Sequence, residues 1–351
     1  MRLRTTRQQR GFSLVELMVA MGLSLVLLAG ALSILYSSKV THAENDRIAR
    51  LQEAGRTVVE LILRDARASG FQGCARPMNP AFIGSVIDAT SAADVRWNML
   101  QPVFGYDTVG GGSTWSPALD AAVTPNATPG SDIIVLRTTR EGMPVFRLTN
   151  SVVNLGANLQ VTGPAGATLA VPSTAMISDC QFATFFVVTG FAAGGAGSAV
   201  IAHGTGGVPA NETTSVDRPF MVNARITPVD SVAYYVAPDA NGRSFLFRRI
   251  GGEDPQPIVE GVENLQAQYG VDTNGDLLAD EYDTAQQVAA AGRWNDVISV
   301  TLSVLIRSED ETNLERDERT YTLLTESFGP FRDRRQRSVF TTTVMLRNRT
   351  T

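Results

Sequence analysis

Hydrophobic positions along the chain fall into two successive patterns. Residues 12–36 are almost wholly apolar, and Glu16 is the only charged residue among them. Twenty-five helical residues with a rise of about 1.5 Å each span roughly 38 Å, more than the ~30 Å hydrocarbon layer of a bilayer. This first pattern predicts one transmembrane helix.

Helical periodicity replaces the continuous apolar run over residues 37–70. The apolar residues recur at spacings of three, four or multiples of these, and Gly55 lies on the same stripe. No proline interrupts residues 12–70, and Gly70 suits a left-handed helix end. We therefore expect one long helix, with a membrane half at 12–36 and an amphipathic continuation at 37–70. Its apolar stripe consists of Val40, Ile48, Leu51, Val58 and Ile62.

From Phe71 onward the chain consists of short runs rich in Val, Ile, Thr and Phe, separated by turn residues. The glycine-rich stretch 190–214 precedes no helix of the kind that a phosphate-binding loop needs, so we interpret it as a surface insertion. These patterns predict an α+β protein, in which the long N-terminal helix packs on a β-rich, mainly antiparallel head at 71–351. The predicted strands are 132–138, 145–148, 176–188, 231–237, 244–250, 296–307, 321–324 and 338–347.

Charge gives the membrane segment an orientation. Residues 1–10 contain four arginines and no acid, which keeps them on the cytoplasmic side and places the chain after Tyr36 outside the membrane. Without residues 1–11 the chain has 26 basic and 35 acidic residues, a net charge of −9. Such a charge argues against bulk attraction for nucleic acid.

The most specific motif is Gly-Phe-Ser-Leu-Val-Glu, which begins at Gly11 behind the basic segment. It resembles the class III N-methylation signal of type IV pilins and type II secretion pseudopilins. The resemblance implies a prepilin leader peptide at 1–11, cleavage between Gly11 and Phe12, N-methylation of Phe12, and an assembly role for Glu16. The alternative is a plain membrane anchor, but a carboxylate at the centre of a membrane helix costs about 2.5–3.5 kcal/mol and needs a reason.

Further segments resemble the PilW family of type IV pilus minor pilins. The resemblance implies a single-pass inner-membrane protein with a periplasmic head, which later joins the pilus tip and serves pilus assembly or priming, twitching motility and adhesion. The partners expected from the resemblance are other minor pilins, the major pilin, a PilY-type tip adhesin, the prepilin peptidase and inner-membrane lipid, with no nucleic acid. These segments are 70–74, 178–180, 269–276 and 339–348.

Three other classes of protein stay open at this point. They are a J-type pseudopilin of type II secretion, a membrane-anchored adhesin that binds through the glycine-rich loops, and a membrane-anchored periplasmic hydrolase. The only histidines, His42 and His203, are far apart and are interpreted as exposed polar residues. Since no nucleophile or cofactor motif accompanies them, the sequence predicts that the protein is not an enzyme.

Two further predictions concern the head. Cys74 and Cys180 are the only cysteines and both lie on the outer side, where an oxidising compartment favours a disulfide between them; the alternative is two buried thiols. An acidic loop places oxygen ligands at positions 1, 3, 5, 7, 9 and 12 of a calcium-loop pattern, although Leu277 replaces the usual glycine at position 6. The alternative is an Asn274-Gly275 hairpin turn. The calcium ligands would be Asp272, Asn274, Asp276, Leu278 through its carbonyl, Asp280 and Asp283.

The basic run 332–337 has two interpretations as well. It could bind an acidic partner surface or DNA, or it is a solvated loop balanced by the acids at 309–311 and 315–318.

Overall fold

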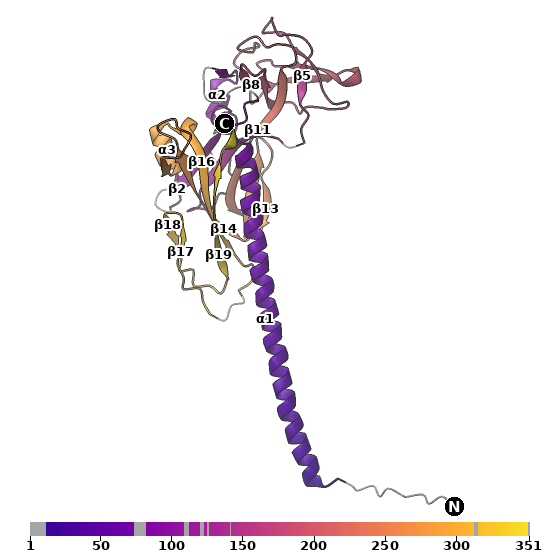
Figure 1. The fold of residues 1–351 in the computed structure, drawn as a ribbon, viewed down its shortest axis with the longest axis vertical. Coiled ribbons are helices and arrows are strands. Elements are labelled where there is room, and N and C mark those ends of the chain that lie inside the picture. Colours follow the sequence, from indigo (N-terminus) through magenta and orange to yellow (C-terminus); the bar gives the residue numbers. More distant parts are fainter. Residues whose placement is uncertain are drawn as a thin grey trace, which may run out of the picture. The chain divides into compact units, whose positions relative to one another are not determined.

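The computed structural model describes residues 12–73, 82–108, 112–119, 123–124, 126–140, 142–311 and 315–349. The chain divides into two compact units, and the boundary along the sequence falls between Gln52 and Glu53. Helix α1 (Leu14–Ala68) forms the described part of the first unit and begins the second (Figure 1). The predicted long helix is therefore confirmed, as is the α+β class.

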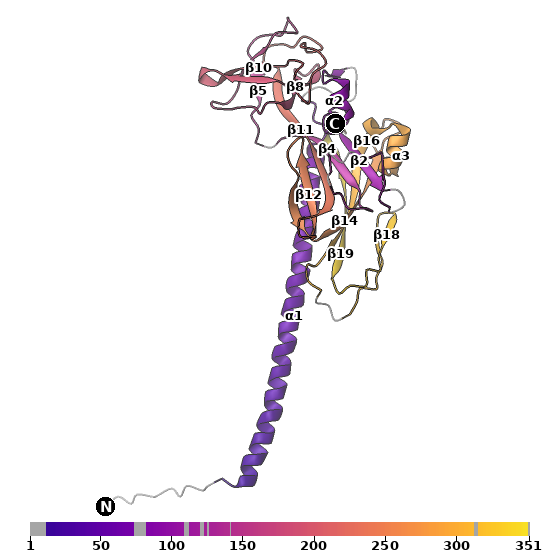
Figure 2. The ribbon, with the colours of Figure 1, turned by 180° about the vertical axis from the view of Figure 1, so that it is seen from behind.

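The largest sheet of the second unit has thirteen strands and is organised around β11 (Arg225–Pro238). Residues 225–228 of β11 pair with β5 and β7, whereas residues from 229 onward pair with β4 and β12. Pro228, which donates no N–H, lies where the partners change. The strand thus joins two lobes of the head, as Figures 1 and 2 show from opposite sides.

The first lobe contains the strands that adjoin the early part of β11. They follow the order β1-β8-β7-β11-β5-β6-β10-β9, with β1 and β8 parallel and the other pairs antiparallel. Their bounds are Ile83–Ser85 for β1, Phe146–Leu148 for β5, Leu159–Thr162 for β6, Ser173–Ser178 for β7, Ala183–Val188 for β8, Gly190–Ala193 for β9 and Ser198–Ala202 for β10.

The second lobe contains the strands that adjoin the later part of β11, and two smaller sheets complete the head. The lobe consists of β2 (Val103–Thr108), β3 (Trp115–Ser116), β4 (Ile133–Thr139), β12 (Ser244–Ile250) and β13 (Gln256–Glu260). One smaller sheet has the order β15 (Glu281–Asp283), β14 (Val262–Val271), β16 (Val297–Arg307), β19 (Arg337–Met345), and the other pairs β17 (Tyr321–Leu323) with β18 (Glu326–Phe328).

Short helices begin and end at residues suited to those positions. Asp88 caps α2 (Ala89–Ala93) by accepting hydrogen bonds from two backbone N–H groups. Thr284 and Gln287 form a capping box at the start of α3 (Ala285–Ala291), which Gly292 closes in a left-handed conformation. Single turns of 3-10 helix occupy Gly195–Gly197, Trp294–Asp296 and Arg347–Arg349.

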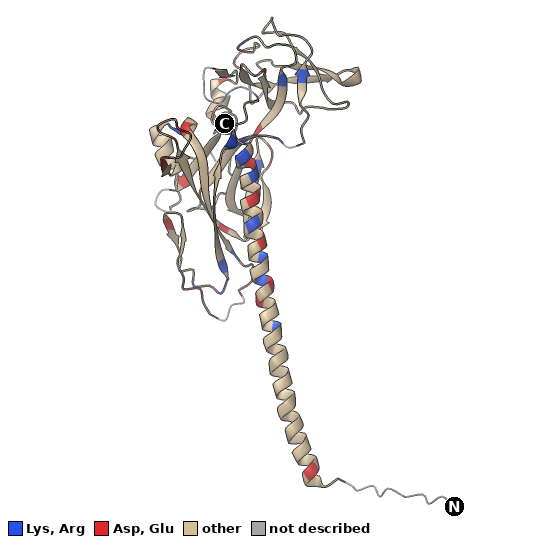
Figure 3. Ribbon diagram, viewed as in Figure 1, with Lys and Arg blue, Asp and Glu red and all other residues tan. Residues whose placement is uncertain are grey.

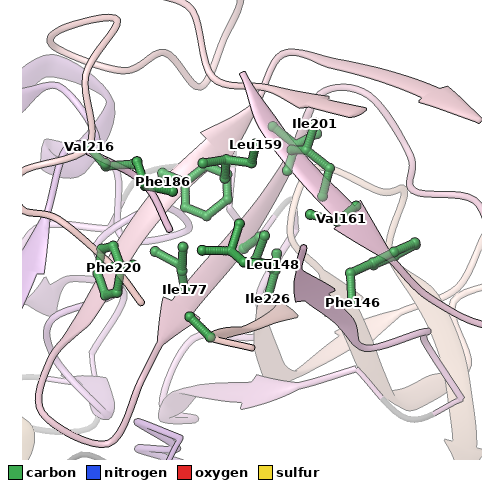
Figure 4. Packing of buried hydrophobic residues seen from close by; sticks show 14 of the residues in the cluster. Phe146, Leu148, Leu159, Val161, Ile177, Phe186, Ile201, Val216, Phe220 and Ile226 are labelled. Atoms are coloured by element: carbon green, nitrogen blue, oxygen red, sulfur yellow. The ribbon is translucent and has the colours of Figure 1, made fainter. Parts of the chain in front are cut away.

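Alternating side chains build the core of the first lobe. β5 and β6 bury every second residue, whereas all six residues of β8 are buried. Figure 4 shows the resulting cluster between the strands. Its labelled members are Phe146, Leu148, Leu159, Val161, Ile177, Phe186, Ile201, Val216, Phe220 and Ile226.

Two expectations about the strands are wrong. The run 176–188 is not one strand, because Asp179 accepts hydrogen bonds from the N–H groups of Gln181 and Phe182 and turns the chain between β7 and β8. The glycine-rich stretch 190–214 is not merely an insertion, since it supplies β9 and β10 to the first lobe. The strand predicted at 244–250 is confirmed with the same bounds.

The end of α1 that belongs to the second unit packs firmly on the head. Val58 and Ile62 are wholly buried, as the predicted stripe requires, and Ala66 is buried with them. Asp65 accepts hydrogen bonds from the Tyr234 hydroxyl at 2.7 Å and from Nη2 of Arg248 at 2.9 Å. These contacts fix residues 53–68 against β11 and β12 by both packing and charge.

We predict that Asp65→Ala lowers the free energy of unfolding by about 2–4 kcal/mol, because it leaves a buried tyrosine hydroxyl and an arginine without their acceptor. Denaturation of the protein in detergent micelles, followed by tryptophan fluorescence, measures the change. Glu60→Ala on the exposed side of the same helix is the control. Equal losses in both variants would contradict a role for the Asp65 contacts.

An acid on β11, Asp230, makes stability depend on pH. The pKa of Asp230 is raised to about 6, chiefly because burial disfavours its charge; Glu253 also raises this pKa, whereas Arg140 and Arg248 oppose the rise. The folded protein therefore holds this proton up to about pH 6, whereas the unfolded chain releases it near the ordinary value of 3.8. Folding stability is lost as pH rises through this window.

We predict that Asp230→Asn removes this loss. The free energy of unfolding of the variant should rise relative to wild type between about pH 4 and pH 6, by up to about 3 kcal/mol. Urea denaturation across this pH range tests the expectation, with the exposed Glu318→Gln as control. Parallel pH profiles for wild type and Asp230→Asn would show that the burial of Asp230 carries no such penalty.

Candidate functional site

The start of α1 presents the residues of the predicted signal in helical geometry. Ser13 precedes the helix, and its hydroxyl accepts a hydrogen bond from the N–H of Val15 at 3.2 Å. Glu16 lies in the first turn, where a negative charge suits the helix dipole. Phe12 is 83% exposed, and Gly11 lies outside the described residues. The arrangement leaves the aromatic ring and the carboxylate free for intermolecular contacts.

The helix surface beyond Glu16 is apolar on every side. No charged residue occurs between Glu16 and Lys39, as the uncoloured stretch in Figure 3 shows. α1 is long and apolar enough to cross a membrane, and none of its apolar window is buried within the protein. Because such a surface is stable only in lipid or against other apolar helices, this part of the chain is a membrane anchor.

The acidic loop after β14 is held together by its own backbone. Asp272 accepts hydrogen bonds from three N–H groups of the loop, those of Asn274, Gly275 and Leu277. Asp280 accepts from Thr273 and Asn274, and hydrogen bonds from Thr273 lower its pKa. The carboxylate oxygens of Asp272 and Asp280 thus stabilise the Asn274-Gly275 turn. They are the same oxygens that would have to coordinate a cation.

Part of the predicted calcium set is in mutual contact, since Nδ2 of Asn274 donates to Asp276 at 3.3 Å and to Asp280 at 3.0 Å. Asp283 forms an ion pair with Arg293 at 2.9 Å rather than facing the loop. Across the part of the chain that the structure describes, no group of three or more His, Cys, Asp or Glu side chains is placed to hold a metal ion. The calcium set Asp272, Asn274, Asp276, Leu278, Asp280 and Asp283 stays a prediction, and several of its oxygens accept hydrogen bonds or an ion pair within the head.

The basic run 332–337 is neutralised from within the head. Arg337 is fully buried and pairs with Glu263 at 2.6 Å, Asp333 at 2.6 Å and Asp317 at 3.2 Å. Burial lowers the pKa of Arg337, but its hydrogen bonds to Asp333 and Glu263 outweigh burial and raise that pKa overall. The hydrogen bond from Arg337 lowers the pKa of Asp333 to about 2. This cluster fastens β19 to β14, a role that the sequence does not reveal.

Other predicted residues have mixed outcomes. His203 is 2% exposed, and its Nε2 lies 3.0 Å from the carbonyl oxygen of Ala157. The interpretation of His203 as an exposed residue is therefore wrong. His42 is exposed, as expected. Cys74 lies outside the described residues, so the disulfide between Cys74 and Cys180 stays a prediction.

Comparison with known proteins returns two family matches. Residues 6–32 match the prokaryotic N-terminal methylation motif, and residues 233–348 match the type IV pilus-assembly protein W family. No curated protein and no solved structure matches the chain. The second match spans the later part of β11, the four-stranded sheet and the Arg337 cluster. Together, the signal at one end of the chain and the match over the other end of the head support the identification of a type IV pilus minor pilin.

Proposed function

We propose that the protein is a minor pilin that helps to prime type IV pilus assembly and takes a place in the pilus tip complex, and so serves twitching motility and adhesion. The observation that carries the proposal is the pairing of an N-methylation motif over 6–32 with a pilus-assembly match over 233–348. The exposed apolar start of α1, most of which lies within the first match, supplies a surface for lateral association. A structural rather than an enzymatic role fits these features.

The pathway begins at the inner membrane, where the arginines of residues 1–10 stay cytoplasmic and the head is periplasmic. The prepilin peptidase removes residues 1–11 and methylates the new N-terminus at Phe12. The head then meets other minor pilins, the major pilin and a PilY-type adhesin. The match over 233–348 carries the name of a pilus-assembly protein, which favours a pilus over a type II secretion pseudopilus.

Glu16 is proposed to act between subunits. Cleavage leaves an amine on Phe12 with an ordinary pKa of about 7.7–8.0, and methylation keeps it basic. The exposed Phe12 and the Glu16 carboxylate in the first turn lie on one helix end, so staggered helices can pair the carboxylate of one subunit with the amine of its neighbour. Each charge alone is unfavourable in lipid, and pairing offsets the penalty and sets the axial register.

The first prediction from this proposal concerns processing. Gly11→Val should leave full-length protein in the membrane, because a branched side chain crowds the peptide bond that the peptidase cuts. Immunoblotting and N-terminal sequencing of membrane fractions measure the outcome, with Ser13→Ala as a matched control that should still be cut. An N-terminus at Phe12 in the Gly11→Val protein would contradict the assignment of the signal.

A further prediction separates assembly from processing. Glu16→Ala should be cut at Phe12 and remain in the membrane, yet support fewer pili and less twitching at native expression. Glu16→Asp, which keeps the charge on a shorter side chain, should retain part of the activity and serves as the control. Wild-type piliation by a correctly processed Glu16→Ala protein would show that the pair between subunits is dispensable.

A further inference from the structure

Two arginines lie directly opposite each other on the first lobe. In the register of β5 and β11, Arg147 faces Arg225, and the next partners outward are Thr162 on β6 and Ser178 on β7. Residues opposite each other in antiparallel strands share one face, with Cβ atoms about 4.5–5.5 Å apart. Both arginines are exposed, while the adjoining Phe146 and Ile226 point into the core. The two guanidinium groups therefore leave the sheet on the same side.

Within the ranges that the structure describes, no counter-charge pairs with these two arginines. The side chains of Arg147 and Arg225 form no hydrogen bond or ion pair with any group in the described ranges. The other arginines around β11 behave differently, because Arg140 pairs with Glu253 and Arg248 pairs with Asp65. Like charges directly opposite destabilise a sheet. Among the described residues, the pair is therefore an uncompensated positive site on a protein with an overall acidic charge.

A hollow of about 220 Å³ adjoins the pair and is bounded in part by Arg225. Its polar side includes Ser178 and Thr227, and its apolar wall includes Met143 and Val145. Pockets for whole small-molecule ligands are larger, about 300–1,000 Å³. The hollow therefore suits one or two side chains of a peptide, one of them apolar.

We propose that the Arg147–Arg225 pair and this hollow bind an acidic peptide segment of another pilus subunit, an inference that rests on the proposed function. One carboxylate of the segment is shared between the two guanidinium groups through charge-assisted hydrogen bonds, which are about twice as strong as neutral ones. A neighbouring apolar side chain enters the hollow beside Val145. A long polyanion is disfavoured, since the overall acidic charge of the protein repels it beyond the pair, whereas a short acidic segment meets only the pair.

The test uses the full-length protein in detergent micelles and a fluorescent peptide of alternating Glu and Leu. Fluorescence anisotropy should show binding of this peptide and not of its Gln-Leu counterpart. The double variant Arg147→Gln, Arg225→Gln should bind about tenfold more weakly or worse, because a charged hydrogen-bonded contact is lost. Arg316→Gln, which removes an exposed charge elsewhere on the head, should leave binding unchanged.

The fold of the variants is checked by thermal melting. The double variant should melt at the same temperature as wild type or higher, since it removes repulsion between like charges. If the double variant melts at a lower temperature than wild type, the binding test is repeated with Arg147→Gln alone. The proposal is overturned if the Glu-Leu and Gln-Leu peptides bind equally, or if the arginine variants bind the Glu-Leu peptide as well as wild type does. It is also overturned if the protein binds single-stranded DNA or an acidic polysaccharide in place of the Glu-Leu peptide. The measurement does not require pilus assembly, so its failure would leave the Glu16 experiment on piliation unaffected.

Discussion

The close packing of the end of α1 is the constraint on which the head depends. Gly55 lies under the ring of Phe340 on β19, so closely that a Cβ there would come within 2.3 Å of it. Ten residues further along, Asp65 binds the side chains of Tyr234 and Arg248, which belong to β11 and β12. One segment of α1 thus packs against both the four-stranded sheet and the thirteen-stranded sheet. The same helix that anchors the protein also holds two of its sheets in place.

The features readable from the sequence are those that depend on local periodicity. The helix follows from an unbroken apolar run and then a stripe that includes Val58 and Ile62, both buried as expected. β14 was missed because Asn264 and Gln266 interrupt its apolar pattern, yet both are buried and donate to the carbonyl of Gly130. The hydrogen-bond partner of such a polar residue lies more than a hundred positions away in the chain. The sequence alone therefore does not distinguish the residue from one in a solvent-exposed loop.

The same distinction applies to the candidate sites. The motif around Gly11 and Glu16 is contiguous, so the sequence alone identifies it. The Arg337 cluster and the Arg147–Arg225 pair depend on strand register, and nothing in the local sequence distinguishes a buried, paired arginine from an exposed, unpaired one. The acidic loop shows the converse, because a ligand-like spacing of oxygens is engaged by hydrogen bonds to its own backbone.

β11 has a mechanical consequence for a protein that serves in a filament. Its fourteen residues pass from one lobe to the other without a break, each pairs with a neighbouring strand, and residues 225–226 and 232–234 pair on both sides. A pulling force applied to the first lobe therefore acts along hydrogen-bonded strands, which must slide past one another together before the lobes separate. A flexible linker between the lobes would instead extend at low force. The continuous strand makes the head a stiff element that transmits tension.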